Sequence, residues 1–278
     1  MIKSIKQVII GDLAFQKTIT PHGEKNEVAG SAFYCAIAAS IITQLSNVGV
    51  IARIGEDFDL APLQKRGIDT QGIAVISGGQ TARFIHTENA DRTRNFVANF
   101  GVAATVDLSQ YPDEYKTATW VHLSTAEPAK QLKWINHLRQ KMPHVTISAD
   151  AFEKFAKESP EPSYKVMQAV DLFFLNEEEL AWLQKSYPRL TISKAVILKK
   201  GENGAEYIDP NYSVTVSSPK VKVVDTTGAG ETLATVYMIL KNNGATIESA
   251  LKQAVQLASK EVTAFGIEHL SPLNLNST

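Results

Sequence analysis

The sequence predicts an α/β fold, a doubly wound and mainly parallel sheet with helices on both faces. Three observations lead to this expectation. Short apolar runs recur along the chain, segments with helical periodicity separate most of them, and the runs are continuously apolar rather than alternating. Continuous apolar runs are typical of strands that are covered on both faces, as in a parallel sheet. With 278 residues, 44% of them hydrophobic, the chain can bury a sizeable core.

Strands and helices are expected to alternate along most of the chain. The expected strands are QVIIG (7–11), NVGVIARIG (47–55), TWVHLS (119–124), HVTISAD (144–150), DLFFLN (171–176) and KAVILKKG (194–201). The expected helices are SAFYCAIAASIITQL (31–45), PAKQLKWINHLRQK (128–141) and NEEELAWLQK (176–185). Two more helices are expected at 228–244 and 246–265, joined by a turn that contains Asn243 and Gly244.

Two segments, 12–30 and 81–100, do not fit this alternation. The first alternates polar and apolar residues around a Pro-His-Gly turn, and the second alternates on both sides of the sequence ENADR, as a hairpin does. They predict a small β-structure outside the main sheet, either a surface hairpin or, as we prefer, a lid over a site at the strand ends. Residues 1–278 are therefore expected to form a single domain with this excursion, because no repeat or long linker divides the chain.

Bulk properties exclude several classes of function. The net charge is −1, which gives no attraction to nucleic acid or to an anionic membrane. No signal peptide is evident, and no uncharged apolar run approaches the ~20 residues that span a bilayer. Cys35 is the single cysteine and is expected to be a buried structural thiol. The sequence therefore predicts a soluble cytoplasmic protein that has neither nucleic-acid nor membrane partners.

The segment DTTGAGET (225–232) has the features of a phosphate-binding turn. Gly228 and Gly230 let the backbone approach a ligand closely, and a helix-compatible run begins directly after them. Because a helix N-terminus offers unpaired N–H groups and the positive end of the dipole, it can bind phosphate-like anions. Glu231 would lie in the first turn, where a carboxylate could accept a proton from a substrate hydroxyl. The alternative is an ordinary connection in which the glycines permit the bend and Glu231 interacts with the dipole.

Three further motifs carry weaker signals. NEEEL (176–180) fits a capping box formed by Asn176 and Glu179, and it also fits a magnesium site in which Glu179 holds the ion. Asp12 directly follows the first strand and is either a turn residue or an acceptor for substrate hydroxyls. AGSAFY (29–34) opens the first long helix with small residues, which permit the approach of a ligand or the packing of the helix on the sheet.

In this order, the motifs resemble those of the ribokinase-like, or phosphofructokinase-B, family of carbohydrate kinases. VVDTTGAGE resembles the family's C-terminal signature D-T-x-G-A-G-D, NEEE matches its N-x-x-E motif, and IIGD and AGSAFY resemble its N-terminal substrate region. KKGENGAEYI (199–208) resembles the G-x-x-G segment before its nucleotide site. The resemblance covers residues 7 to 268, and the C-terminal signature is its specific part. It implies an enzyme that transfers the γ-phosphoryl group of ATP to a hydroxyl of a sugar, cyclitol or nucleoside, with Mg²⁺ as cofactor.

The resemblance also implies roles for individual residues. Glu231 takes the position of the general base, and Gly228, Ala229 and Gly230 take that of the anion hole. The nucleotide and its magnesium ion are assigned to Asn176, Glu179, Lys199, Gly201 and Thr227, with Glu179 as the magnesium ligand. Asp225, with Thr227, matches positions that hold a monovalent cation, potassium, in some members. Substrate contacts are assigned to Asp12, Gly30, Ser31, Tyr34, Arg83 and Ser124. The hairpin that carries Arg83, His86, Arg92 and Arg94 corresponds to the family's lid, which pairs subunits into a homodimer in many members.

This chain departs from the family pattern at several positions. Ala29 and Tyr34 stand where a second glycine and an asparagine are common, and Ser124 stands where a ribose-binding glutamate is expected. These changes argue against ribose and for another alcohol, and the arginines of the lid leave an anionic sugar phosphate open.

The largest departure is Glu231, because the family's base is an aspartate. The reference pKa values of the two side chains differ by only ~0.4 unit, so the extra methylene matters through placement. A misplacement of ~1 Å costs about 100-fold in rate. The sequence therefore leaves two hypotheses, an active kinase and a catalytically weak or non-catalytic binding protein on the same scaffold. A dinucleotide-dependent oxidoreductase is disfavoured, because no G-x-G-x-x-G follows the first strand.

Overall fold

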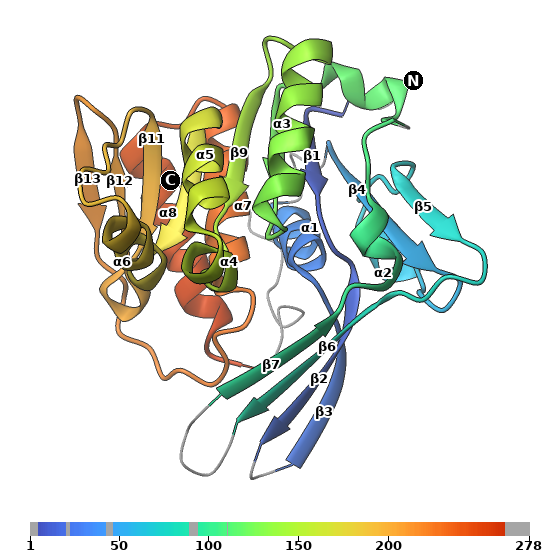
Figure 1. Ribbon diagram of the computed structural model, residues 1–278. Coiled ribbons are helices and arrows are strands. Elements are labelled where there is room, and N and C mark those ends of the chain that lie inside the picture. The colour runs from blue at the N-terminus through green and yellow to red at the C-terminus, as the bar shows by residue number, and fades with distance from the viewer. Residues whose placement is uncertain (1–4, 21–22, 43–46, 89–93, 110, 265–278) are drawn as a thin grey trace.

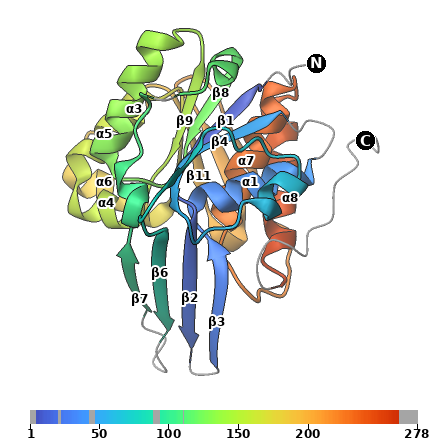
Figure 2. The same ribbon diagram turned by 90° about the vertical axis from the view of Figure 1, so that its right-hand side faces the viewer.

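The computed structural model describes residues 5–20, 23–42, 47–88, 94–109 and 111–264. Within these residues it contains a nine-stranded sheet in the order β13-β12-β11-β10-β9-β8-β1-β4-β5 and a four-stranded sheet in the order β3-β2-β6-β7 (Figures 1 and 2). The strands of the large sheet are β1 (Gln7–Ile10), β4 (Val48–Gly55), β5 (Ile73–Ile76), β8 (Trp120–Leu123), β9 (Thr146–Asp150), β10 (Leu172–Asn176), β11 (Ala195–Lys199), β12 (Ala205–Ile208) and β13 (Ser213–Val216). The strands of the small sheet are β2 (Ala14–Thr20), β3 (Gly23–Ala29), β6 (Ala82–Glu88) and β7 (Arg94–Asn99).

The α-helices are α1 (Ser31–Ile41), α2 (Ala61–Lys65), α3 (Pro128–Lys141), α4 (Glu153–Glu158), α5 (Pro160–Ala169), α6 (Glu177–Ser186), α7 (Ala229–Asn242) and α8 (Ile247–Glu261). Short 3₁₀ helices lie at η2 (Gly101–Thr105), η3 (Asp113–Thr117) and η4 (Gly201–Asn203). In the large sheet the seven strands from β5 to β11 are parallel, and only β12 and β13 add to the edge in antiparallel fashion. All six expected strands belong to this sheet, so the predicted fold class is confirmed.

Helices cover the large sheet on both faces. One core cluster joins α1, α7 and α8 to the sheet, and a second joins α3, α5 and α6 to its other face (Figure 1). The helix α7 is buried from Thr232 to Leu240, because it lies between the sheet and its neighbours α1 and α8. Each large apolar side chain buried in this way stabilises the fold by about 1.5–3 kcal/mol. The Cys35 thiol is fully buried within α1, as expected from its apolar neighbours.

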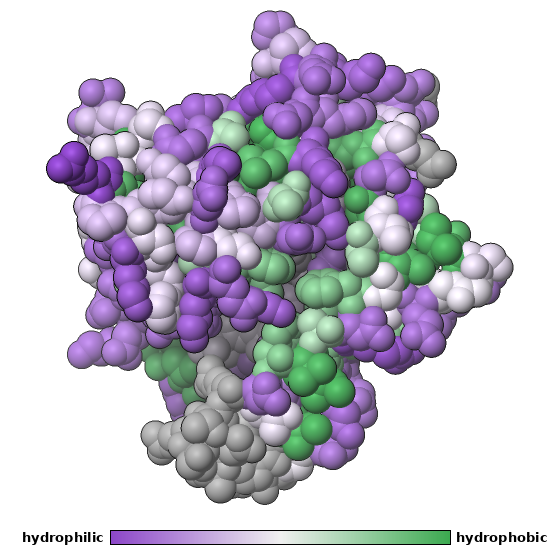
Figure 3. Space-filling view, in the orientation of Figure 1, coloured by the Kyte–Doolittle hydropathy of each residue, from purple (hydrophilic) through white to green (hydrophobic). Residues whose placement is uncertain are grey.

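The small sheet projects from the edge of the main body (Figure 1). It contains both segments that break the alternation, and the strands β2 and β6 pair in parallel at its centre. Its aromatic side chains include Phe84, which lies 5.6 Å from the ring of Phe96. Figure 3 shows apolar residues gathered along this sheet, whereas the surface over α4, α5 and α6 is mostly hydrophilic. We call the four strands the lid. The Pro21–His22 part of the first expected turn and the residues 89–93 of the second lie outside the described residues.

Each lid hairpin is closely packed at its base. Gly30 has a φ of +104°, and a Cβ on it would lie 2.4 Å from the carbonyl oxygen of Asp12. Gly101 has a φ of +48°, and its Cβ would lie 2.1 Å from the carbonyl oxygen of Gln80. Because no real Cβ approaches an oxygen so closely, only glycine fits either position.

Candidate active site

The predicted site residues gather at one edge of the large sheet. The strands β1, β8, β9, β10 and β11 are parallel, so their carboxyl ends meet at the same edge. Those ends carry Asp12, Ser124, Asp150, Asn176 and Lys199. In open α/β sheets this edge is where ligands bind.

The turn before α7 has the backbone geometry of an anion cradle. Gly228 is the N-cap and has a φ of +90°, and a Cβ on it would lie 2.6 Å from Oε1 of Glu261 and 2.8 Å from the ring of Tyr34. The helix begins at Ala229, so the amides of its first turn have no partners within the helix. Gly230 lies in this first turn, and a Cβ there would be 3.2 Å from Nζ of Lys199. A helix N-terminus and an ammonium group therefore lie side by side, as anion binding requires.

Glu231 is in the first turn of α7, as predicted, and is partly buried. Burial and, to a smaller extent, the carboxylate of Asp150 together raise the pKa of Glu231 to about 7, although the ammonium of Lys199 acts in the opposite direction. A carboxylate with a pKa near 7 is better suited to accept a proton at neutral pH than an ordinary one. The environment therefore alters the basicity of Glu231, which a comparison of reference values for Asp and Glu could not reveal.

Lys199 lies at the centre of the acidic residues. Its Nζ is 3.1 Å from Oδ1 of Asp150, whose side chain is 3% exposed. Burial opposes the charge on Lys199, but the carboxylates of Asp150, Glu179 and Glu231 outweigh it and raise the pKa of the lysine. Burial likewise opposes the charge on Asp150, but Lys199 and His122 hold its pKa below the ordinary value. The two groups therefore form an ion pair in which the carboxylate is buried and the lysine side chain is 20% exposed.

Asn176 and Glu179 form the expected capping box at the start of α6. The backbone N–H of Glu179 donates to Oδ1 of Asn176 at 2.8 Å, and the backbone N–H of Asn176 donates to Oε2 of Glu179 at 2.7 Å. The structural interpretation of this motif is thus confirmed. Glu179 is 5% exposed, and burial raises its pKa, although Lys199 lowers it. Its role as a magnesium ligand stays a prediction, which the capping box does not exclude.

The carboxyl group of Asp12 lies in the substrate half of the predicted site. Its side chain is 9% exposed, and burial raises its pKa to about 6 against the charge of Lys130. The carbonyl oxygen of Asp12 accepts from the N–H of Ala32 at 3.1 Å, and the same carbonyl packs against Gly30. These contacts link the end of β1 to the start of α1.

Ser31 and Ser124 bond to each other beneath this half. The Ser31 hydroxyl donates to Oγ of Ser124 at 2.9 Å, and the Ser124 hydroxyl donates to the carbonyl oxygen of Ile10 at 3.0 Å. Ser124 is fully buried, so its observed role is to join β8 to β1. Direct contact of either serine with a substrate stays a prediction.

Arg83 extends from the lid but is already paired. Its Nη2 lies 2.7 Å from Oδ2 of Asp57, and its guanidinium stacks over the ring of Phe15 at 4.9 Å. The side chain is 54% exposed, so a ligand could still reach it. Arg92 and the side chain of Arg94 lie outside the described residues.

A group of buried oxygens without well-formed hydrogen bonds lies behind the anion cradle. The Tyr34 hydroxyl, the Thr232 hydroxyl and both carboxyl oxygens of Glu261 are buried and make no well-formed hydrogen bond among the described residues, although Thr232 lies close enough to Glu261 to lower its pKa. Asp225 lies nearby, because its N–H donates to Val262 at the end of α8 and its Oδ1 accepts from the N–H of Thr227 at 3.0 Å. Burial, helped by the charges of Glu231 and Asp225, raises the pKa of Glu261 to about 8, although the hydroxyl of Thr232 acts in the opposite direction. Buried polar groups without a well-formed hydrogen bond are unusual in proteins, and a bound water or ion is one explanation for them.

The nucleotide side of the predicted site is open. Gly201 has a φ of +54° and begins η4, with no atom within 4 Å of the position of a Cβ. No strand precedes the cradle, since residues 217–226 form neither helix nor strand. Val221, Val223 and Val224 in this stretch are 39%, 54% and 40% exposed. An apolar surface therefore lies next to the helix N-terminus.

The described residues fit magnesium that is held mainly by phosphates. No group of three or more His, Cys, Asp or Glu side chains among them could hold a metal ion alone. Glu179 does offer a buried carboxylate at the strand ends. Such sparse protein ligation is usual for Mg²⁺, which keeps several waters and binds substrate phosphates.

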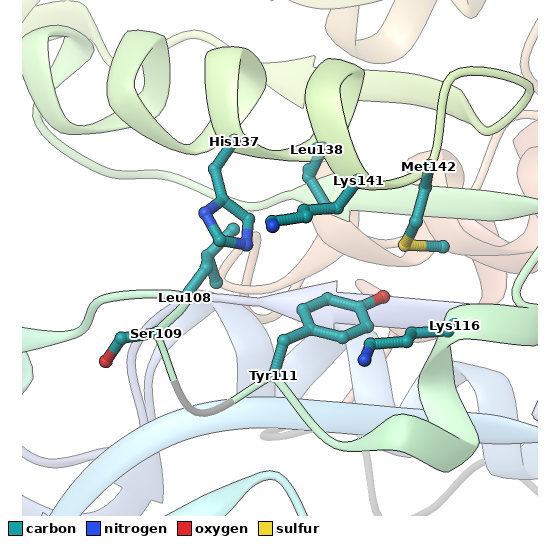
Figure 4. A pocket seen from close by; sticks show the side chains of 8 residues that line it. All are labelled: Leu108, Ser109, Tyr111, Lys116, His137, Leu138, Lys141 and Met142. Carbon is teal, nitrogen blue, oxygen red and sulfur yellow. The ribbon is translucent and has the colours of Figure 1, made fainter.

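A separate cavity of about 230 Å³ lies elsewhere, between η3 and the C-terminal end of α3 (Figure 4). Its lining includes Tyr111, Lys116, His137, Lys141 and Met142. None of the predicted site residues lines this cavity.

Sequence reasoning missed three residues of the site, Asp150, His122 and Glu261. His122 is 1% exposed, and its Nε2 lies 3.1 Å from Oδ2 of Asp150. The one signal for Asp150 was its position as the last residue of an apolar strand. The signal for His122 was its position as a histidine within the apolar run TWVHLS. The sequence gives no signal for Glu261, because it belongs to a helix with many polar residues.

The comparison with protein families identifies the chain. The model of the pfkB family carbohydrate kinases matches residues 9–273. A cytidine kinase of Thermococcus kodakarensis is 24% identical over 271 residues, which cover 93% of this chain and 96% of that protein. An ATP-dependent ribose-1-phosphate kinase of Halopiger xanaduensis is 26% identical over 81% of this chain and 78% of its own.

The fold is also shared with a solved structure. The nucleoside kinase of Burkholderia thailandensis in complex with inosine superimposes with a TM-score of 0.82 at 15% identity, covering 96% of this chain and 92% of that chain. These findings confirm the resemblance that the motifs carry. The chain belongs to the pfkB family of carbohydrate kinases and is a kinase that transfers phosphate to a hydroxyl group of a sugar or nucleoside.

Proposed function

We propose that the chain phosphorylates a hydroxyl of a nucleoside with ATP as the donor, and that Glu231 is the general base. The observation that supports this most directly is the position of Glu231 at the start of α7, beside Gly230 and Lys199. A proton acceptor, a helix N-terminus and an ammonium group are the parts that phosphoryl transfer to an alcohol needs. ATP is the expected donor because a relative is named as ATP-dependent.

In this proposal the amides of Gly228, Ala229 and Gly230 hold the oxygens of the transferring phosphoryl group. Glu231 accepts the proton of the attacking hydroxyl, and Asp12 orients the substrate through its other hydroxyls. Asn176, Lys199, Gly201 and Thr227 contact the nucleotide. Magnesium held near Glu179 would neutralise charge on the phosphates.

A nucleoside is favoured because of the aromatic side chains between the lid and the main body. Phe96 of β7 meets Phe152, which follows β9, with ring centroids 6.0 Å apart. Both side chains are only half-buried, so they can take further contacts. Stacking of a base on an aromatic ring contributes about 1–3 kcal/mol. The relative named as a cytidine kinase makes cytidine the first substrate to test.

A monovalent cation is proposed for the buried oxygens behind the cradle. The family resemblance implies such a site at Asp225 and Thr227, and Glu261 adds a buried carboxyl group beside them. A cation there would offset the charges of Asp225 and Glu261 and hold the cradle in place. Potassium is the ion to test first.

The lid is proposed to pair two copies of the chain. Ile85 and Val97 are opposite each other on β6 and β7 and are 39% and 53% exposed. An apolar pair on one face of a sheet gains stability if a second copy covers it. We also propose that residues 1–278 act as a single catalytic domain with this lid.

The decisive experiment is a panel of acceptors with coupled detection of ADP. The panel contains cytidine, inosine, ribose, ribose 1-phosphate, fructose and an inositol, each with magnesium and with either potassium or choline salt. We expect turnover to be fastest with a nucleoside. Turnover confined to ribose 1-phosphate would refute the nucleoside assignment and leave the kinase assignment intact.

Variants at Glu231 test the base. Glu231→Gln should lower kcat by about 10²- to 10⁴-fold while the affinity for ATP remains. Glu231→Asp retracts the carboxylate by about 1 Å and should cost about 100-fold if the site is built around glutamate. A gain of activity in Glu231→Asp would instead indicate a decayed base. The alternative of a weak or non-catalytic binder gains no support from the relatives, which are named as kinases.

A further inference from the structure

A chain of buried hydrogen bonds runs along β8 and β9, from Trp120 at the start of β8 to Asp150 at the end of β9. Nε1 of Trp120 donates to Oγ of Ser148 at 2.8 Å, and Oγ of Ser148 lies 2.9 Å from Nδ1 of His122. Nε2 of His122 lies 3.1 Å from Oδ2 of Asp150, and Nζ of Lys199 donates to Oδ1 of Asp150 at 3.1 Å. The exposed fractions of Ser148, His122 and Asp150 are 0%, 1% and 3%.

The donors from Trp120 to His122 all point toward Asp150, and Lys199 donates to Asp150 from the other side. Because Trp120 can only donate, it occupies a lone pair of Ser148 and leaves the hydroxyl proton free to bond to His122. The sulfur of Met238, at 2.9 Å, is a weaker acceptor for that proton. With Nδ1 of His122 accepting, Nε2 carries the hydrogen and donates to Asp150. Each carboxylate oxygen of Asp150 is therefore taken, one by a histidine and the other by Lys199.

This arrangement determines where the ammonium of Lys199 lies. Asp150 cannot rotate without losing its bond to His122, so its second oxygen offers Lys199 one fixed acceptor. The ammonium then lies 3.2 Å from the position of a Cβ on Gly230. A long lysine side chain has much rotamer freedom, and a buried, doubly bonded acceptor removes it.

We propose that His122 and Asp150 are positioning residues that hold the Lys199 ammonium against the first turn of α7, where it aligns the anion cradle with Glu231. This inference rests on the proposed role of Glu231. Lys199 lies beside Gly230 of the cradle, whereas His122 and Asp150 act on the cradle through Lys199, and Asp150 in addition raises the pKa of Glu231. Their effect should therefore fall on kcat, while the KM of the acceptor should change by less than about 3-fold.

The first test measures the exposure of Lys199 without ATP or an acceptor. The protein is acetylated with a succinimidyl ester, and the modification of Lys199 is compared by mass spectrometry with that of the neighbouring Lys200. We expect Asp150→Asn to raise the ratio of Lys199 to Lys200 labelling by about 10- to 100-fold, since a charge-assisted bond is lost. An unchanged ratio would overturn the proposal.

The second test uses a conservative pair at His122. His122→Gln keeps an N–H donor near the position of Nε2, whereas His122→Leu removes it. With a nucleoside as acceptor, His122→Leu should lower kcat by about 10-fold, and His122→Gln should restore most of the loss. Equal activity of the two variants would refute a positioning role and indicate that the histidine only fills space.

Asp171→Asn is the matched control. Asp171 likewise pairs with a lysine, since its Oδ1 accepts from Nζ of Lys194 at 3.4 Å and its Oδ2 accepts from Nη2 of Arg139 at 2.7 Å and from the N–H of Ile147 at 2.8 Å. However, Asp171 precedes β10 at the opposite edge of the sheet. This variant should leave the labelling ratio and kcat unchanged. If no acceptor is phosphorylated by the unmodified protein, the proposed function fails, and the labelling experiment still decides the position of Lys199.

Discussion

Replacing Glu261 with glutamine should flatten the dependence of stability on pH. Glu261 is 1% exposed, and neither of its carboxyl oxygens makes a well-formed hydrogen bond to the described residues. Its pKa is about 8 in the folded protein, mainly because of burial, against an ordinary value of 4.5. Between these values the folded protein keeps a proton that the unfolded chain releases. The free energy of unfolding therefore falls as the pH rises from 4.5 to 8, and is unaffected by this group below that window.

The size of this effect follows from the shift in pKa. Each unit of difference corresponds to about 1.4 kcal/mol, so the full window corresponds to about 5 kcal/mol. Glutamine stays neutral at every pH, and its buried amide costs about 1–3 kcal/mol independently of pH. Glu261→Gln should thus be slightly less stable than the unmodified protein near pH 5 and more stable at pH 9.

Urea denaturation at about pH 5, 7 and 9 in choline salt measures this difference. Glu248→Gln is the control, because Glu248 is exposed on the same helix and its loss should not change the slope. If Glu261→Gln and the unmodified protein lose stability in parallel as the pH rises, the reasoning is wrong. Adding potassium should stabilise the unmodified protein at high pH more than Glu261→Gln, because a cation would compensate the buried carboxylate.

Three other predictions concern the cradle, the capping box and the lid. Gly228→Ala should destabilise the fold by about 1–3 kcal/mol, because residue 228 has a positive φ and the new Cβ would clash with Glu261. Gly230→Ala should instead lower kcat with little change in Tm. Equal losses of Tm in the two variants would contradict this prediction. Glu179→Gln keeps the capping box but removes the charge, so the KM for magnesium should rise about tenfold. Glu178 is exposed on the same helix, and Glu178→Gln should leave this KM unchanged. A similar KM for magnesium in both variants would exclude Glu179 as the ligand. Ile85→Lys should convert a dimer to monomers in sedimentation experiments, and a dimer that survives it would exclude pairing through this face of the lid.

The main sheet could be predicted because its strands are apolar on both faces. The elements that the sequence did not reveal are the short or half-exposed ones. β12 and β13 have four residues each and form the antiparallel edge of the sheet. Side chains alternate between buried and half-buried along β12, and between exposed and half-buried along β13. The helices α4 and α5 are short and meet at Ser159–Pro160, so neither has a long helical period.

The candidate site shows a similar division. Residues within one contiguous motif, such as Gly228 to Glu231, could be assigned from the sequence because the chain itself determines their spacing. His122, Asp150 and Lys199 come from three strands, and their contact depends on strand order and register. Glu261 meets Gly228 only because α8 packs against α7, which no local pattern encodes.

The two glycines at the base of the lid have a mechanical consequence. Gly30 against Asp12 and Gly101 against Gln80 hold the stems of both hairpins together, and β2 pairs with β6 between them. Any movement of the lid is therefore expected to carry its four strands together as one rigid unit, rather than as two independent hairpins. Because Gly30 packs against the backbone of Asp12, such a movement would also shift a carboxylate of the substrate half. Shutting the site and orienting the acceptor would then be a single movement.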